Sequence, residues 1–193
     1  PVSSGKAALT LILRALKAIS KEKKEVVIPA YTCFSVPSAI VKAGLEPTPC
    51  DIDPRTFDFD YGLLKKTVNE KTLCVIPNHI FGIPSDMDAV KKICGNKGVY
   101  IVEDAAQAMG GRFKGRKLGT IGDAGFFSFG RGKNITCGSG GVIITNSKAI
   151  GAALEEEFSK IDFPGAVETA AELLKPALMA ALIHPLLYWI PSG

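Results

Sequence analysis

The chain has 193 residues, of which 47% are hydrophobic and 22% charged, so it can bury a full core and is expected to form one domain with at most an appendage. Its 23 Lys and Arg residues against 19 Asp and Glu give a net charge of +4, and no basic tract is longer than KEKK, which argues against nucleic acid as a partner. Five scattered cysteines without C-x-x-C spacing indicate reduced thiols, so neither a disulfide framework nor a metal site is expected. A cytoplasmic location is expected, since PVSSGK has no basic segment followed by an apolar run.

Apolar residues recur at helical spacing from Leu9 to Ile19, which predicts a helix over residues 4–20 with Ser4 as its cap. Further helices are expected near residues 34–43, 60–68 and 85–95. Short β-branched or apolar runs predict strands near residues 25–29, 46–51, 72–77, 98–104, 124–129 and 140–146. This alternation predicts an α/β fold with three αβα layers, in which helices cover both faces of a mostly parallel sheet.

The composition changes near Phe163, beyond which the chain is rich in Ala and Leu. We therefore expect a large domain over residues 1–163 and an apolar helical appendage over residues 164–193. Residues 173–190 are apolar, but Lys175, His184 and two prolines interrupt them, and the segment is near the short limit for crossing a bilayer of ~30 Å. A buried or interface-packing helix pair is the preferred interpretation, and an interfacial membrane contact is the alternative.

Three features combine: two stand at the carboxyl ends of strands, where an open α/β sheet binds its ligands, and the third is the start of a helix. Asp104 ends an apolar strand, Lys133 stands among glycines after another, and the first predicted helix opens on Ser4, Gly5 and Lys6. Alone, Asp104 could simply cap a turn. Together the three predict pyridoxal phosphate (PLP) chemistry: the amine forms a Schiff base, the carboxylate keeps the pyridine nitrogen protonated, and helix N–H groups hold the phosphate.

Motifs in unbroken order over roughly residues 3–147 carry a family resemblance. They are SSGKAAL, VVIPAYTC, GLEPTPCDID, HIFGIPSDMDA, VEDAAQAMGG, KGRKLGTIGDAGFFSF and KNITCGSGGVIITN. The sequence resembles the DegT/StrS group of sugar aminotransferases, which are fold type I PLP enzymes. The resemblance implies that Lys133 and Asp104 are catalytic, and that the cofactor is held by these two residues and by Gly5, Lys6, Cys33, Gln107 and Ser128.

The resemblance also assigns individual contacts. It places Gln107 beside the phenolic oxygen of the cofactor, and Ser128 with the Gly5 and Lys6 amides at its phosphate. Three positions depart from the family pattern: Lys6 stands where Thr is usual, Cys33 where an aromatic residue often stacks on the ring, and Met109 where His is common.

The sequence leaves two interpretations open for each of two further side chains. His79 is either a hydrogen-bonded structural residue or a ligand contact, and Arg131 is either an anion contact or a solvated charge. The resemblance further implies a homodimer and a smaller C-terminal domain that is missing from this chain, which begins two residues before the phosphate-binding motif.

The predicted function is a PLP-dependent aminotransferase that moves an amino group from glutamate or glutamine to a keto-sugar, expected to be nucleotide-linked, through a Lys133 Schiff base. One alternative is a PLP-dependent sugar dehydratase, but its close relatives carry His in place of the lysine. Another is a PLP-binding regulatory or scaffold module without catalysis. A Rossmann dehydrogenase is excluded because PAYTCFS follows the first strand in place of G-x-G-x-x-G.

Overall fold

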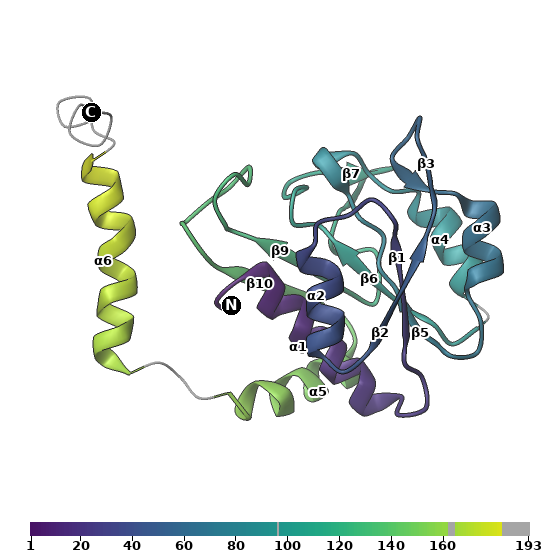
Figure 1. Ribbon diagram of the computed structural model, residues 1–193, viewed down its shortest axis with the longest axis horizontal. Helices are drawn as coiled ribbons and strands as arrows, with labels where there is room; N and C mark the ends of the chain where they lie inside the picture. The colour runs from purple at the N-terminus through teal and green to yellow at the C-terminus, as the bar shows by residue number, and fades with distance from the viewer. Residues whose placement is uncertain (96, 162–164, 183–193) are drawn as a thin grey trace. The chain divides into compact units, whose positions relative to one another are not determined.

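The computed structural model describes residues 1–95, 97–161 and 165–182 (Figure 1). The chain divides into two compact units, Pro1–Phe158 and Ser159–Gly193. The first unit holds the sheet and the predicted site residues. The assignment of a large domain to residues 1–163 and of an appendage to residues 164–193 stays a prediction.

A six-stranded sheet in the order β10-β9-β6-β5-β1-β2 forms the centre of the first unit. Its strands are β1 (Glu25–Pro29), β2 (Glu46–Cys50), β5 (Thr72–Val75), β6 (Tyr100–Asp104), β9 (Ala124–Ser128) and β10 (Gly141–Thr145). All neighbours pair in parallel except β9 and β10, which are antiparallel. The predicted α/β fold with a mostly parallel sheet is therefore confirmed, and each of the six strands ends within two residues of its predicted limits.

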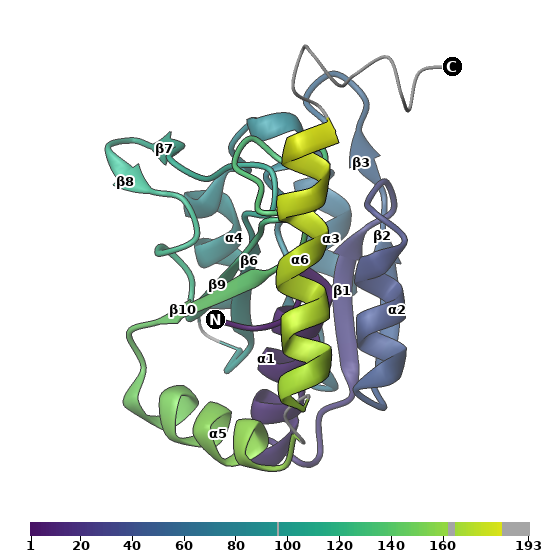
Figure 2. The same ribbon diagram turned by 90° about the vertical axis from the view of Figure 1, so that its left-hand side faces the viewer.

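Helices cover both faces of the sheet, because alternate strand residues point to opposite sides. Val26 and Ile28 share one core with residues of α1 (Gly5–Ile19) and α2 (Ser35–Lys42). Val27, between them in sequence, belongs to a second core with residues of α3 (Tyr61–Thr67) and α4 (Met87–Cys94) (Figures 1 and 2). The two cores make the predicted αβα layers.

Polar caps explain where the helices begin. The Ser4 hydroxyl accepts a hydrogen bond from the Ala7 amide at 3.1 Å, as predicted for the first helix. Asp60 and Asp86 cap α3 and α4 in the same way. All four predicted helices begin and end within two residues of their expected limits.

The structure also contains elements that the sequence pattern did not predict. Two short hairpins join β3 (Ile52–Asp53) to β4 (Asp58–Phe59) and β7 (Arg112–Phe113) to β8 (Arg116–Lys117). A single 3₁₀ turn, η1 (Ile80–Gly82), follows β5, and α5 (Lys148–Ser159) follows β10. Strands of two residues are too short to show the alternation on which strand prediction depends.

The second unit contains α6 (Ala166–Leu182), which includes the first part of the apolar segment predicted at residues 173–190. Leu174, Lys175 and Leu178 of this helix are exposed. Within the described part of the chain, no helix has both the length and the apolar character needed to cross a bilayer. Residues 183–190, including His184, lie outside the described residues, so the alternative of an interfacial membrane contact stays open.

Candidate active site

Asp104 ends β6 with its carboxyl group almost completely buried. Its Oδ1 accepts the Ala106 amide at 3.1 Å, and its Oδ2 has no hydrogen-bond partner among the described residues. Burial raises the pKa of this carboxyl, while the Ala106 bond and the positive charge of Lys133 oppose the rise without cancelling it. Burial destabilises the ionised form of this carboxyl and a nearby cation stabilises it, so the group can bind a protonated ring nitrogen.

Lys133 lies in the loop between β9 and β10, where it is half-buried. Gly132 has φ of 76°, a left-handed conformation that favours glycine, and the Lys133 amide donates to the Gly130 carbonyl at 3.3 Å. The Asn134 amide group donates to the Met109 carbonyl at 3.0 Å, which ties this loop to the segment that follows Asp104. The glycines therefore bend the chain at Lys133, and the positive charge of Lys133 opposes the rise in the pKa of Asp104 that burial causes.

The start of α1 touches the end of β9. A Cβ atom on Gly5 would lie 2.7 Å from Ser128 Cβ and 3.0 Å from Ser128 Oγ, so only glycine allows this approach. The Ser4 carbonyl accepts the Ala8 amide, while the Gly5 and Lys6 amides have no hydrogen-bond partner in the described part of the chain. Two open N–H groups at a helix N-terminus beside a serine hydroxyl suit an anion such as a phosphate.

Asp104 and Ser128 lie on the same face of the sheet as α1. Val102 and Phe126, two residues before each of them on their strands, both belong to the core that contains α1. Because β6 and β9 are paired neighbours, the carboxyl, the hydroxyl and the helix start meet at one edge of one face.

Gln107 lies beside the η1 turn. Its Oε1 accepts the Phe81 amide at 3.0 Å, and Phe81 has a left-handed φ of 56°. This bond assigns the amide orientation. Its NH₂ group has no hydrogen-bond partner within the residues that the structure describes, so it can donate to an oxygen of a ligand.

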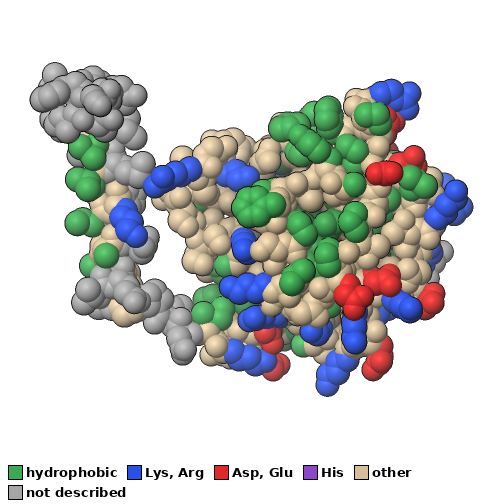
Figure 3. Space-filling view, viewed as in Figure 1, with side chains coloured by type: hydrophobic (Ala, Val, Ile, Leu, Met, Phe, Trp, Pro, Cys, Tyr) green, Lys and Arg blue, Asp and Glu red, His purple; other side chains and the backbone are tan. Residues whose placement is uncertain are grey.

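Cys33 is exposed in the turn after β1, and its sulfur accepts a hydrogen bond from the Ser35 hydroxyl at 3.1 Å. Its neighbours Tyr31 and Phe34 are also exposed. Tyr31 begins a row of ring contacts, with centroids 5.8 Å from Phe57 and then 6.0 Å from Phe57 to Phe81. We call Tyr31, Phe57 and Phe81 the aromatic row. Figure 3 shows hydrophobic side chains in several separate patches on one face of this unit.

His79 and Glu103 form a fully buried pair that the sequence did not identify as one. The Ser85 amide donates to His79 Nδ1 at 3.1 Å, so Nε2–H donates to Glu103 Oε2 at 3.0 Å and the imidazole is neutral. His79 thus has the structural role that was one of its two interpretations. A glutamate inside an apolar strand needs several hydrogen-bond donors around it. This pattern is the sequence signal that indicates a buried, bonded Glu103.

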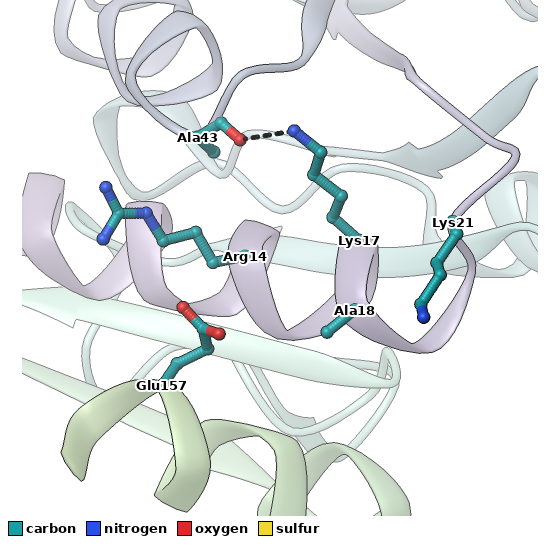
Figure 4. Close-up of a pocket in the computed structure, with 6 residues that line it drawn as sticks. All are labelled: Arg14, Lys17, Ala18, Lys21, Ala43 and Glu157. Carbon is teal, nitrogen blue, oxygen red and sulfur yellow. Dashed lines mark hydrogen bonds between the residues drawn. The ribbon is translucent and has the colours of Figure 1, made fainter. Parts of the chain in front are cut away.

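The residues at this edge of the sheet fit PLP by the chemistry of their donors and acceptors. The half-bonded buried carboxyl of Asp104 suits the ring nitrogen, the open Gly5 and Lys6 amides suit the phosphate, and Lys133 supplies an amine. The pocket in Figure 4, about 360 Å³ in volume, lies elsewhere. It is lined by Arg14, Lys17, Ala18, Lys21, Ala43 and Glu157.

Comparison with known proteins gives consistent matches. Residues 1–171 match the profile of the DegT/DnrJ/EryC1/StrS aminotransferase family. A pleiotropic regulatory protein of Geobacillus stearothermophilus is 42% identical over 123 residues, which are 63% of this chain and 33% of that protein. A GDP-perosamine synthase of Vibrio cholerae is 35% identical over 149 residues, which are 77% of this chain and 40% of the synthase.

A solved structure matches over the same region. The X-ray structure of S. venezuelae DesV has a TM-score of 0.72 and 36% identity, with 79% of this chain and 41% of DesV covered. The chain therefore spans about two fifths of the length of the synthase and of DesV, and about a third of the regulatory protein.

Proposed function

Because the chain belongs to the DegT/DnrJ/EryC1/StrS aminotransferase family, whose members are fold type I enzymes that use PLP, we propose that it carries the cofactor-binding core of a sugar aminotransferase. The amino donor is glutamate or glutamine, and the acceptor is a nucleotide-linked keto-sugar. The names of the relatives support this substrate class, since one of them is a GDP-perosamine synthase. The observation that carries the proposal is Asp104, a buried carboxyl with one oxygen free of described partners and the charge of Lys133 nearby.

Asp104 binds the ring nitrogen and keeps it protonated. The raised pKa of the carboxyl has burial as its main cause, and a cation at Oδ2 would lower it and favour the ionised form. Bound PLP supplies an electron sink for the electrons of the C–H bond that is broken during amino transfer. Asp104 sets the strength of that sink through the proton that it holds in place.

Lys133 anchors the cofactor and moves protons. Its side chain extends from a loop bent by glycines, and its charge reaches Asp104, so the amine and the carboxyl lie at the same edge. A lysine amine in this place is nucleophilic when neutral and, once released, would move a proton between the substrate carbon and the cofactor carbon in each half-reaction. The two half-reactions then follow in ping-pong order.

The remaining contacts orient the cofactor. The Gly5 and Lys6 amides at the start of α1, with the Ser128 hydroxyl, bind its phosphate. The Gln107 NH₂ group donates to its phenolic oxygen, because the carbonyl of the same side chain is already bonded to Phe81. Cys33 lies after β1, where the resemblance places the residue that contacts the ring.

We further propose that the chain forms a homodimer. The aromatic row lies on the surface, with Tyr31 50%, Phe57 39% and Phe81 61% exposed, and Phe81 is bonded to the candidate site through Gln107. Adjacent exposed aromatic side chains are typical of interaction surfaces. The expected result in light scattering is a dimer, and Phe81→Ser shifts it toward the monomer.

A non-catalytic PLP-binding regulatory module is the second candidate. It is favoured by the 42% identity to a protein named as a pleiotropic regulator. It predicts cofactor binding without turnover of any amino donor. The dehydratase alternative is disfavoured by Lys133, for the reason given from the sequence.

The first experiment is an absorbance spectrum of the protein with added PLP, before and after borohydride reduction, beside Lys133→Ala. We expect a visible band in the wild type that reduction makes permanent, with the label mapped to Lys133, and no such band in the variant. Addition of glutamate or glutamine should then bleach the band. A folded wild-type chain without a band refutes the proposed cofactor site, and a band that no amino donor bleaches favours the regulatory module.

A further inference from the structure

We propose that Glu103 is a positioning residue that, acting through His79 from the opposite face of the sheet, fixes the placement of Asp104 and Gln107 toward the cofactor. This inference rests on the proposed function of the site. The side chains of Glu103 and His79 bond to none of the groups that would contact PLP, so neither is a catalytic residue.

Glu103 and Asp104 are neighbours on β6 and therefore point to opposite faces. Asp104 faces the core that contains α1, whereas Ile101, two residues before Glu103, belongs to the core beneath α3 and α4. Glu103 is completely buried on that second face. It thus lies directly behind the candidate site.

The Glu103 carboxylate is saturated with donors. Its Oε2 accepts His79 Nε2–H at 3.0 Å and the Gly119 amide at 2.8 Å. Its Oε1 accepts the Ile121 amide at 2.5 Å and the Gly122 amide at 2.6 Å. These four bonds hold the loop that leads into β9, the strand that ends at Ser128, and they hold the imidazole of His79.

His79 continues the connection to the site along two routes. Its backbone amide donates to the Asp104 carbonyl at 3.0 Å, and the Asp104 amide donates to the Pro77 carbonyl at 2.9 Å, so residues 77–79 hold the backbone of Asp104 from both sides. The Gly82 amide then donates to the His79 carbonyl at 3.2 Å, which closes the η1 turn. That turn presents the Phe81 amide to Gln107 Oε1.

Two residues proposed to contact the cofactor are therefore held by one segment, residues 77–82, and a side chain in that segment is held by Glu103. Loss of the Glu103 charge should loosen both contacts together. A purely structural role would lower the stability of the fold and leave the bound cofactor unchanged in the molecules that remain folded.

The test compares Glu103→Gln with Asp123→Asn. Asp123 is a matched control because it lies in the same loop before β9 and its Oδ2 accepts the Ile101 amide at 2.7 Å, but it makes no bond to the 77–82 segment. We expect E103Q to weaken PLP binding about tenfold or more and to shift the absorbance band of the bound cofactor. D123N should lower the melting temperature while it keeps the wild-type band and affinity.

Variants of His79 test the route of the effect. Gln can reproduce both side-chain bonds, one as a donor and one as an acceptor, so His79→Gln should retain most of the affinity, and His79→Leu should lose as much as E103Q. The double variant E103Q/H79L should lose no more than either single change, since both act through one connection. If E103Q does not fold, His79→Gln and His79→Leu still test the proposal.

Hydrogen exchange without cofactor separates this inference from the proposed function. E103Q should raise the exchange rates of the Phe81 and Asp104 amides, and D123N should not. An E103Q protein with wild-type affinity, band and exchange overturns the inference while the proposed function stands. A wild type that never binds PLP refutes the proposed function, and an unchanged exchange pattern in E103Q then refutes the positioning role as well.

Discussion

Gly5→Ala perturbs the place where the start of α1 meets the end of β9. The added Cβ would lie 2.7 Å from Ser128 Cβ, whereas ordinary contact begins near 3.4 Å, so the helix and the strand must separate by roughly 0.7 Å, the difference between these two values. Rotation of the serine side chain moves only Oγ and leaves Cβ in place, so it cannot relieve this contact. The clash thus involves the backbone of both elements.

The expected cost follows from two opposing effects. Overpacking of this kind costs about 1–3 kcal/mol. Alanine recovers at most about 1 kcal/mol of helix propensity, and less at the first position of a helix. A net loss of about 1–2 kcal/mol should lower the melting temperature by about 2–8 °C for a chain of this size. PLP binding should weaken as well, because the Gly5 and Lys6 amides move away from Ser128.

Thermal unfolding and PLP titration measure the two effects. Gly151→Ala is the matched control: no atom lies within 4 Å of its added Cβ in α5, so it should be neutral or stabilising. The double variant Gly5→Ala/Ser128→Gly removes the clashing atoms and should be more stable than the sum of the single effects predicts. A G5A protein as stable as the wild type, or strictly additive changes in the double variant, refutes the reasoning.

Three further predictions concern ionisation and thiols. The pKa of Asp104 is raised by burial, so its ionised form costs stability above the usual pKa, and Asp104→Asn should raise the melting temperature of the cofactor-free protein at pH 7 while transamination falls by orders of magnitude. Burial tends to raise the pKa of Glu103, but hydrogen bonds from His79, Gly122 and Gly119 lower it by more. Glu103→Gln should therefore lower the melting temperature by its full amount at neutral pH, and the difference from the wild type should disappear as the pH falls below 4.5. In a thiol titration with a disulfide reagent, Cys33 and Cys137 should react at once, and bound PLP should slow Cys33. The buried thiols should react only on unfolding: Cys50, Cys74 and Cys94.

The fold was predictable because its elements are long enough to repeat a pattern. The first helix shows apolar residues at helical spacing from Leu9 to Ile19 and begins at a recognisable cap, Ser4, and the strands that contribute to both cores are short apolar runs. The hairpin at residues 112–117 escaped because its turn, Lys114-Gly115, carries a left-handed lysine with φ of 48° in place of the usual Asn or Asp. Local residue preference there gives little indication of the turn.

The residue types of the candidate site could be predicted from the sequence, but the contacts that hold these residues in place could not. Residue type and position at the ends of predicted elements identify Asp104, Lys133 and Gly5 in the sequence. The bond from Phe81 to Gln107 could not be predicted, since it joins residues 26 positions apart through a turn with a left-handed aromatic residue. The contact of Gly5 with Ser128 joins two ends of the unit that only the sheet order brings together.

The two adjacent carboxyls of β6 show why hydrogen-bond satisfaction separates a supporting residue from a reacting one. Glu103 and Asp104 share a strand, a charge and deep burial, yet Glu103 accepts four hydrogen bonds and its pKa is lowered, whereas Asp104 has one side-chain bond and its pKa is raised. A saturated carboxylate has no capacity left for a ligand, and its removal costs the fold. A buried carboxyl with one hydrogen bond keeps an oxygen that can accept another, and until that oxygen is bonded the carboxyl destabilises the fold. Such a group is expected where a ligand supplies the missing bond. This criterion supports the proposals that Asp104 binds the cofactor and that Glu103 positions the residues that do.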